Sequence, residues 1–152
     1  MKLHPRGQNF KLYDLRLLGP FMESLEEHDM PVLLHSDPAC TYSNPFYIAE
    51  LARTFPKVTV IMGHMGMVYD TVDAIFIATK VPNLVLETST HVGSARVLQA
   101  VEAIGAERVV FGSDFPSSHP LVEMKKIEVV ELPKDQERLV MGENMARILK
   151  IK

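Results

Sequence analysis

Residues 108–116, RVVFGSDFP, give the clearest indication of how this chain folds. The stretch begins with β-forming apolar residues, breaks at Gly112, and places the carboxylate of Asp114 in a turn that Pro116 closes. Parallel α/β folds present their chemistry in this way, on residues that follow the carboxyl ends of buried strands. Aspartate is also a good cap of turns and helices, so the stretch alone leaves both roles open for Asp114.

Three runs upstream end in the same manner, with polar side chains after a short apolar stretch: residues 31–36 (PVLLHS), 58–64 (VTVIMGH) and 83–89 (NLVLETS). They are rich in Leu and β-branched residues and lack polar alternation, which is typical of strands buried on both faces. The carboxyl ends of parallel strands share one edge of a sheet. We therefore expect His35, His64 and Asp114 to lie close together.

Other polar residues occupy the same expected edge. Thr and Ser at a strand end often satisfy backbone groups, and this is the expected role of Thr88 and Ser89. Glu87 is expected between its strand and a helix, paired with a base. Residues 1–5, MKLHP, read as the end of a further strand, which would bring Lys2 and His4 to the rim.

Helical patterns separate the predicted strands. They cover residues 14–29, 44–54, 68–80, 94–104 and 121–130, with two short helices at 135–141 and 144–149. Pro20 lies inside the first pattern, and we expect that helix to restart there. Strands that alternate with helices predict a parallel α/β sheet with right-handed crossovers.

Two α/β architectures fit this order: an open doubly wound sheet, or part of a TIM-like (β/α)₈ barrel. A complete barrel typically needs ~250 residues, and this chain has 152. In the barrel interpretation, the five strands correspond to about strands 4 to 8. Either way, residues 1–152 are expected to form a single domain.

Composition excludes several classes of protein. Apolar residues make up 47% and charged residues 23%, as in ordinary soluble globular proteins, and the formal net charge of −3 gives no footprint for nucleic acid. The single cysteine, Cys40, cannot form an internal disulfide. The N-terminal residues lack the apolar core of a signal peptide, and no apolar run reaches the ~20 residues needed to span a bilayer. We expect a cytoplasmic protein without membrane partners.

His35, His64 and Asp114 are the candidate site. Imidazole and carboxylate suit Zn²⁺ and also Mn²⁺ or Fe²⁺, and the same groups can transfer protons without a metal. A single histidine at a strand end has a structural role about as often as a functional one. Two histidines and an aspartate on three separate strand ends favour a site, because the fold brings them together.

Several motifs in this order resemble a known family. They are KLHP at the start, PVLLHS, LARTFPKVTVIMGHMG, PNLVLETS, GAERVVFGSDFP and the terminal MGENMARIL. Together they extend over nearly the whole chain, and they resemble the amidohydrolase-related family of metal-dependent hydrolases (amidohydrolase-2 type).

The resemblance implies a metallo-dependent hydrolase barrel with a mono- or binuclear metal site. His35 would be the metal ligand of the fifth strand, and His64 the sixth-strand histidine, used as a second ligand or as acid/base. Asp114 would be the eighth-strand ligand that also shuttles a proton. A metal-bound water, with zinc as the first choice of metal, would attack a small ester, lactone or amide substrate. Some relatives decarboxylate acids at the same site, so a metal-dependent decarboxylase is the alternative.

The chain departs from the family pattern at one point. The family's first strand supplies a His-x-His pair, and no such pair occurs here. The first three strands are expected to be absent, which leaves three alternatives: a homo-oligomer, a barrel completed by a separate N-terminal half, or a non-catalytic remnant. An open α/β binding domain with structural histidines is a further interpretation.

Overall fold

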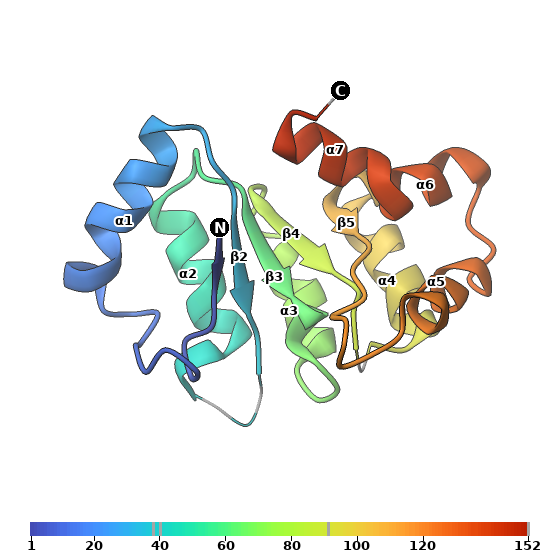
Figure 1. Ribbon diagram of the computed structural model, residues 1–152, viewed down its shortest axis with the longest axis horizontal. Coiled ribbons are helices and arrows are strands. Elements are labelled where there is room, and N and C mark those ends of the chain that lie inside the picture. The colour runs from blue at the N-terminus through green and yellow to red at the C-terminus, as the bar shows by residue number, and fades with distance from the viewer. Residues whose placement is uncertain (38, 40, 91, 152) are drawn as a thin grey trace.

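A computed structural model describes residues 1–37, 39, 41–90 and 92–151 of the chain (Figure 1). Cys40 lies outside the described residues. Within them, five short strands form one sheet, and helices cover both of its faces unequally. The predicted α/β class is therefore confirmed.

The five strands are parallel and lie in chain order across the sheet. They are β1 (Lys2–Leu3), β2 (Val32–His35), β3 (Val60–Gly63), β4 (Leu84–Glu87) and β5 (Val109–Val110). The register places Leu34 of β2 beside Met62 of β3, and Met62 beside Leu86 of β4. All carboxyl ends consequently meet at one edge of the sheet.

A helix lies in each connection between consecutive strands, as parallel pairing requires. The helices are α1 (Leu15–Glu27), α2 (Pro45–Thr54), α3 (Thr71–Ala78), α4 (Ser94–Ile104), α5 (Pro120–Glu128), α6 (Lys134–Arg138) and α7 (Asn144–Leu149). Short 3₁₀ turns lie at Thr41–Ser43, His64–Gly66 and Ala106–Arg108, and a π-helical turn at Leu139–Glu143 precedes α7.

Local sequence explains where two of these helices begin and continue. At α2, the Asn44 side chain accepts a hydrogen bond from the Phe46 amide, and Pro45 occupies the first helical position. The expected restart of the first helix at Pro20 is wrong, because α1 runs through it. Pro20 is the sixth residue of α1, so it removes one hydrogen bond near the helix start without ending the helix.

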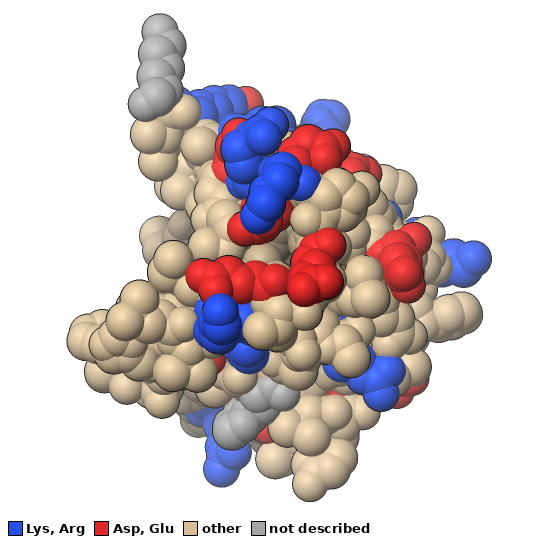
Figure 2. Space-filling view, turned by 90° about the vertical axis from the view of Figure 1, so that its right-hand side faces the viewer, with Lys and Arg blue, Asp and Glu red and all other residues tan. Residues whose placement is uncertain are grey.

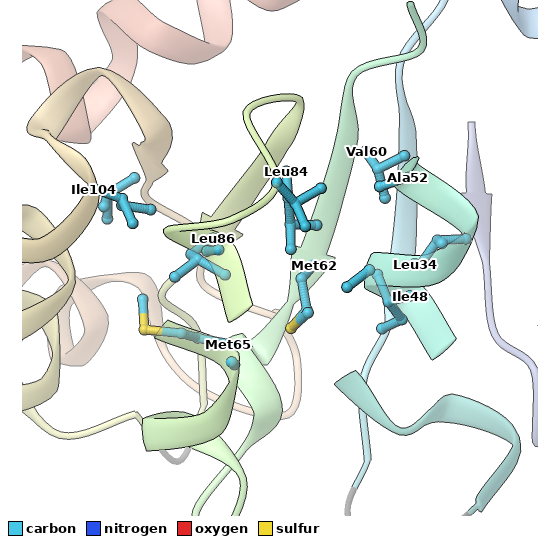
Figure 3. Packing of buried hydrophobic residues seen from close by; sticks show 14 of the residues in the cluster. Leu34, Ile48, Ala52, Val60, Met62, Met65, Leu84, Leu86 and Ile104 are labelled. Atoms are coloured by element: carbon cyan, nitrogen blue, oxygen red, sulfur yellow. The ribbon is translucent and has the colours of Figure 1, made fainter. Parts of the chain in front are cut away.

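The main core lies between the sheet and helices α1 to α4 (Figures 1 and 3). Alternate strand residues point into it and are fully buried: Val32, Leu34, Val60, Met62, Leu84, Leu86 and Val109. The helices contribute side chains such as Ile48, Ala52 and Ile104, whose spacing gives each helix one apolar stripe. This side of the sheet contains most of the buried apolar surface.

The opposite face of the sheet has a smaller cluster. Ile61, Val85 and Val110 are buried there, and Met145 and Ile148 of α7 pack against them. Alternation along each strand therefore separates two apolar faces, as predicted for strands buried on both sides. Helix α7 therefore covers the face of the sheet opposite the main core.

The side of the molecule that carries α5 and α6 has charges of both signs (Figure 2). Ion pairs between neighbouring turns, Lys125–Glu128 and Lys134–Glu137, contribute to this mixture. No helix among the described residues combines the length and the apolarity that crossing a membrane would require.

Candidate active site

The structure brings the three predicted site residues together at the carboxyl edge of the sheet. His35 is the last residue of β2, His64 follows the last residue of β3, and Asp114 lies in the turn after β5. Ser36 links the first two strand ends, because its hydroxyl donates to the Gly63 carbonyl (2.5 Å) and accepts from the Gly66 amide (2.8 Å).

Three histidines are in contact at this edge. His64 Nε2 lies 3.0 Å from His35 Nδ1, so the two imidazoles share one hydrogen bond. The ring of His4 stacks on the ring of His35, with centroids 3.8 Å apart and planes 14° from parallel. The expectation that His4 would join the rim is therefore confirmed.

Burial and proximity keep the imidazoles of His35 and His64 neutral near pH 7. Burial, then the neighbouring His64 and His4, lower the pKa of His35 to about 4. Burial also lowers the pKa of His64, against the opposing effect of the Glu87 and Asp114 carboxylates. A neutral imidazole has a free nitrogen lone pair, so it can accept a proton or bind a metal.

Asp114 is joined to the histidines through Thr90. The Thr90 hydroxyl lies 3.0 Å from His64 Nδ1 and 3.5 Å from Asp114 Oδ2. Lys2 Nζ, from β1, is 3.8 Å from Asp114 Oδ1, which confirms that Lys2 also reaches the rim. The Asp114 carboxylate consequently has the Lys2 ammonium group on one side and the Thr90 hydroxyl on the other.

Glu87 is buried beneath this group and was expected to pair with a base. The base is His64, whose Nδ1 lies 3.8 Å from Glu87 Oε2. The carboxylate also accepts hydrogen bonds from the backbone amides of His64 and Ser89 (both 2.8 Å) and from the Ser89 hydroxyl (2.9 Å). Lys126 of α5 pairs with Glu123 and donates to the carbonyl of Thr90 (2.8 Å). The sequence indicated that polar residues gather at the end of β4, but not which groups they bind.

The segment that follows β5 approaches Glu87 so closely that it requires a glycine. A Cβ atom added at Gly112 would overlap the Oε1 atom of Glu87. The glycine of the motif RVVFGSDFP therefore makes room for the buried carboxylate.

The turns that carry the site have unusual backbone conformations. His64, Thr90 and Asp114 have φ angles of +64°, +67° and +49°, in the left-handed region that side chains other than glycine seldom occupy. For a β-branched residue such as Thr90, this conformation is rare. Backbone of this kind persists where the surroundings hold it, and it concentrates at functional sites.

A cavity of about 380 Å³ opens beside these residues. Its walls are Lys2, Leu33, Gly63, His64, Glu87, Ser89, Phe111, Gly112, Ser113, Asp114, Phe115 and Met145. The cavity has a size suited to a small molecule, and its walls combine apolar side chains with charged and polar ones.

The donor types at this edge suit a divalent ion, but their arrangement does not form a metal-binding group. In residues 1–37, 39, 41–90 and 92–151, no three His, Cys, Asp or Glu side chains are placed so that they could hold an ion. His64 makes hydrogen bonds through both ring nitrogens. Of the four ring nitrogens of His35 and His64, only His35 Nε2 makes no hydrogen bond within the described part of the chain.

Comparison with known proteins identifies relatives of this chain. Residues 1–151 match the sequence model of a family described as amidohydrolase. No curated protein sequence gives a significant match.

Solved structures share the fold. A TIM-barrel protein of uncharacterised function from Bordetella bronchiseptica superposes with a TM-score of 0.80 at 25% identity, over 93% of this chain and 52% of its own. A dihydroxybenzoic acid decarboxylase from a Polaromonas species, solved with bound manganese and the inhibitor 2-nitroresorcinol, gives 0.72 at 17% identity, over 93% and 56%. A Pseudomonas putida protein described provisionally as a 2-pyrone-4,6-dicarboxylic acid hydrolase gives 0.72 at 16% identity, over 99% and 62%.

These similarities distinguish between the two predicted architectures. The parallel sheet corresponds to part of a TIM barrel rather than to an open doubly wound sheet. The chain spans between 52% and 62% of the length of these three relatives.

Proposed function

Since this chain belongs to the amidohydrolase family, we propose that it forms part of a metal-dependent hydrolase that acts on a small ester, lactone or amide. The divalent ion is proposed to be zinc, with manganese or iron as the next choices for a site built from imidazole and carboxylate. The manganese in the Polaromonas decarboxylase supports a divalent metal in this fold.

One observation carries the proposal. His35, His64 and Asp114 come from three different strand ends, and hydrogen bonds through Thr90 and between the imidazoles connect them beside a cavity. A structural role for each residue alone would not require the three to meet. Their meeting at the carboxyl edge is what a TIM-barrel active site needs.

The proposed roles follow from the surroundings of each group. His35 would be a metal ligand through Nε2, and Asp114 a ligand whose carboxylate also takes up a proton at the cavity. His64 lies between them and is proposed as the acid/base residue or as a further ligand. The neutral state of both imidazoles supports these roles, because a protonated imidazole has no lone pair.

A metal-dependent decarboxylase of the same family is the second candidate. The observation in its favour is that the solved structures with this fold include a dihydroxybenzoic acid decarboxylase. The cavity walls, which combine Phe111, Phe115 and the ammonium group of Lys2, would also suit an aromatic acid.

The remaining part of the barrel is proposed to come from polypeptide outside this sequence. The chain spans about half of its solved relatives, and β1 and β5 each pair on one side only among the described residues. Free strand edges are normally paired or covered. Either a second copy of the chain or an N-terminal half-barrel would pair with them and supply further ligands.

Metal content tests the proposal most directly. Where a partner supplies the further ligands, we expect about one divalent ion per chain in protein purified without chelator, measured by elemental analysis beside the native mass. Asp114→Ala and His35→Ala should each lower the content at least tenfold, because each removes a proposed ligand.

His28→Ala is the matched control, since the His28 ring binds the Ser24 carbonyl at the end of α1. If Asp114→Ala and His35→Ala retain the metal of the wild type, the proposed site is wrong. A discrete assembly with no metal would favour the non-catalytic interpretation.

A further inference from the structure

A buried carboxylate at the end of β4 has no part in the proposed reaction. Glu87 is only 7% exposed, and three donors surround it: the amides of His64 and Ser89 and the Ser89 hydroxyl. Each of these contacts uses Glu87 as an acceptor, which is the only role a carboxylate has. A buried carboxylate is costly, so its purpose calls for an explanation.

The direction of the hydrogen bonds can be followed from Glu87 to the first histidine. The Ser89 hydroxyl has one proton, and it donates this proton to Glu87 Oε2. The lone pairs of Ser89 Oγ therefore face His64 Nδ1, 2.9 Å away. Two lone pairs repel each other at that distance, so His64 must carry its proton on Nδ1.

Thr90 acts in the same sense. Its hydroxyl has two other acceptors, Ser89 Oγ at 3.3 Å and the carboxylate of Asp114 at 3.5 Å, and donation to either leaves a lone pair toward His64 Nδ1. The Glu87 carboxylate is also 3.8 Å from His64 Nδ1 and favours a proton there. Ser89 and Glu87 thus select Nδ1, and the Thr90 hydroxyl is compatible with a proton there while Ser89 Oγ accepts its hydrogen.

The second imidazole follows from the first. A neutral imidazole has one N–H, so a proton on Nδ1 leaves a lone pair on His64 Nε2. That lone pair is 3.0 Å from His35 Nδ1, which must then be the donor. The lone pair of His35 is left on Nε2.

We propose that Glu87 is a positioning residue, which acts through Ser89 and His64 to hold the lone pair of His35 on Nε2. The sequence of donors runs from His35 Nδ1 to His64 Nε2, from His64 Nδ1 to Ser89 Oγ, and from Ser89 Oγ to Glu87. Its purpose rests on the proposed function, in which Nε2 of His35 is the atom that binds the metal. In metal sites generally, a partner on the second ring nitrogen fixes the tautomer and orientation of a ligating histidine.

Ring-nitrogen NMR tests the tautomers without metal or substrate. The full chain, labelled with ¹⁵N in its histidines, would be examined near neutral pH, with His35→Gln and His64→Gln used to assign the signals. We expect both imidazoles to show a protonated Nδ1 and an unprotonated Nε2. A proton on Nε2 of either ring in the wild type would overturn the proposal.

Ser89→Ala removes the link to Glu87 at little cost in volume. We expect the His64 signals to lose the pure Nδ1–H pattern, with His35 changing in parallel, and Glu87→Gln should act in the same direction. The matched control is Thr88→Val, because the Thr88 hydroxyl is buried beside Ser89 and has no hydrogen-bond partner among the described residues. Equal patterns in Ser89→Ala and wild type, or equal changes in Ser89→Ala and Thr88→Val, would contradict the proposal.

Zinc titration connects the network with the proposed site. We expect Ser89→Ala to bind zinc about 10-fold more weakly than wild type, as is usual when the partner of a ligand is lost. Equal affinities in two chains that both bind zinc would overturn the positioning role. If wild type binds no zinc although its tautomers are as expected, the proposed function fails while the hydrogen-bonded network remains.

Discussion

Gly112 has no room for a side chain, because the carboxylate of Glu87 occupies the position of its Cβ atom. In Gly112→Ala, either β5 moves away or Glu87 gives up its three donors. We expect a loss of about 2 to 4 kcal/mol in the free energy of unfolding, the sum of overpacking and unpaired amides. Chemical denaturation measures it.

Gly142→Ala is the control for this prediction, since an added Cβ at Gly142 meets nothing within 4 Å. We expect its stability to stay within about 1 kcal/mol of wild type, because alanine is the better helix former. Similar losses in both variants would show that the space at Gly112 does not matter.

At the scale of residues, the sequence predicted which side chains meet but not how. His35, His64 and Asp114 each lie at the end of an apolar run. Because these runs form parallel strands, their carboxyl ends share one edge of the sheet. Their hydrogen bonds depend on the left-handed turns at His64 and Thr90, which no pattern of residue types indicates. Glu87 has its expected base in His64, but it also accepts hydrogen bonds from backbone amides, which every residue carries and which no sequence pattern indicates.

Among the elements, α7 is held in place by its first residue. Asn144 is fully buried, and its amide donates to the carbonyls of Ala106 (2.7 Å) and Val109 (2.9 Å). Asn144→Ala leaves both carbonyls without these donors. We expect a loss of about 2 kcal/mol in the free energy of unfolding, measured by urea denaturation.

Glu102→Ala is the control for Asn144→Ala, because Glu102 is an exposed residue of α4. It should change stability by no more than about 0.5 kcal/mol. A loss for Asn144→Ala that is no larger than this would mean that α7 is anchored by its apolar contacts alone.

Most elements were predicted from the sequence, and the differences lie at their ends. Apolar runs and helical spacing located all five strands and the helices between them. The chain passes through Pro20 as a helix because a proline near the start removes a single hydrogen bond, while packing of Leu18, Met22 and Leu25 stabilises both sides of it. The periodicity of the sequence indicates the apolar stripe, but not whether packing outweighs the hydrogen bond lost at Pro20.

At the scale of the whole molecule, the two faces of the sheet bury unequal amounts of apolar surface. Leu86 is fully buried in the main core, whereas Ile148 of α7 is partly exposed over the opposite face. Leu86→Ala should therefore cost about 2 to 5 kcal/mol of stability, and Ile148→Ala about half of that or less, because less packing is lost. Equal costs, measured by thermal or urea unfolding, would show that α7 packs as tightly as the helices of the main core.

The choice between a barrel and an open sheet was beyond the sequence pattern. Both architectures use the same alternation of strands and helices, and they differ in how the sheet curves and what pairs with its edges. The likeness to TIM-barrel structures resolved that choice. The same likeness confirms the partial barrel that the family resemblance implied, because the chain covers only 52% of the Bordetella protein.

The order of the strands has a consequence for how the chain folds as it is synthesised. Each strand pairs with the strand that precedes it in the sequence. The edge on which a new β/α unit packs has therefore already been synthesised when that unit leaves the ribosome. Ribosomes add ~5–20 residues per second, slowly enough for one unit to settle before the next emerges. Asp114 follows the last strand to dock. We therefore expect the histidine pair to form on the nascent chain before Asp114 reaches it.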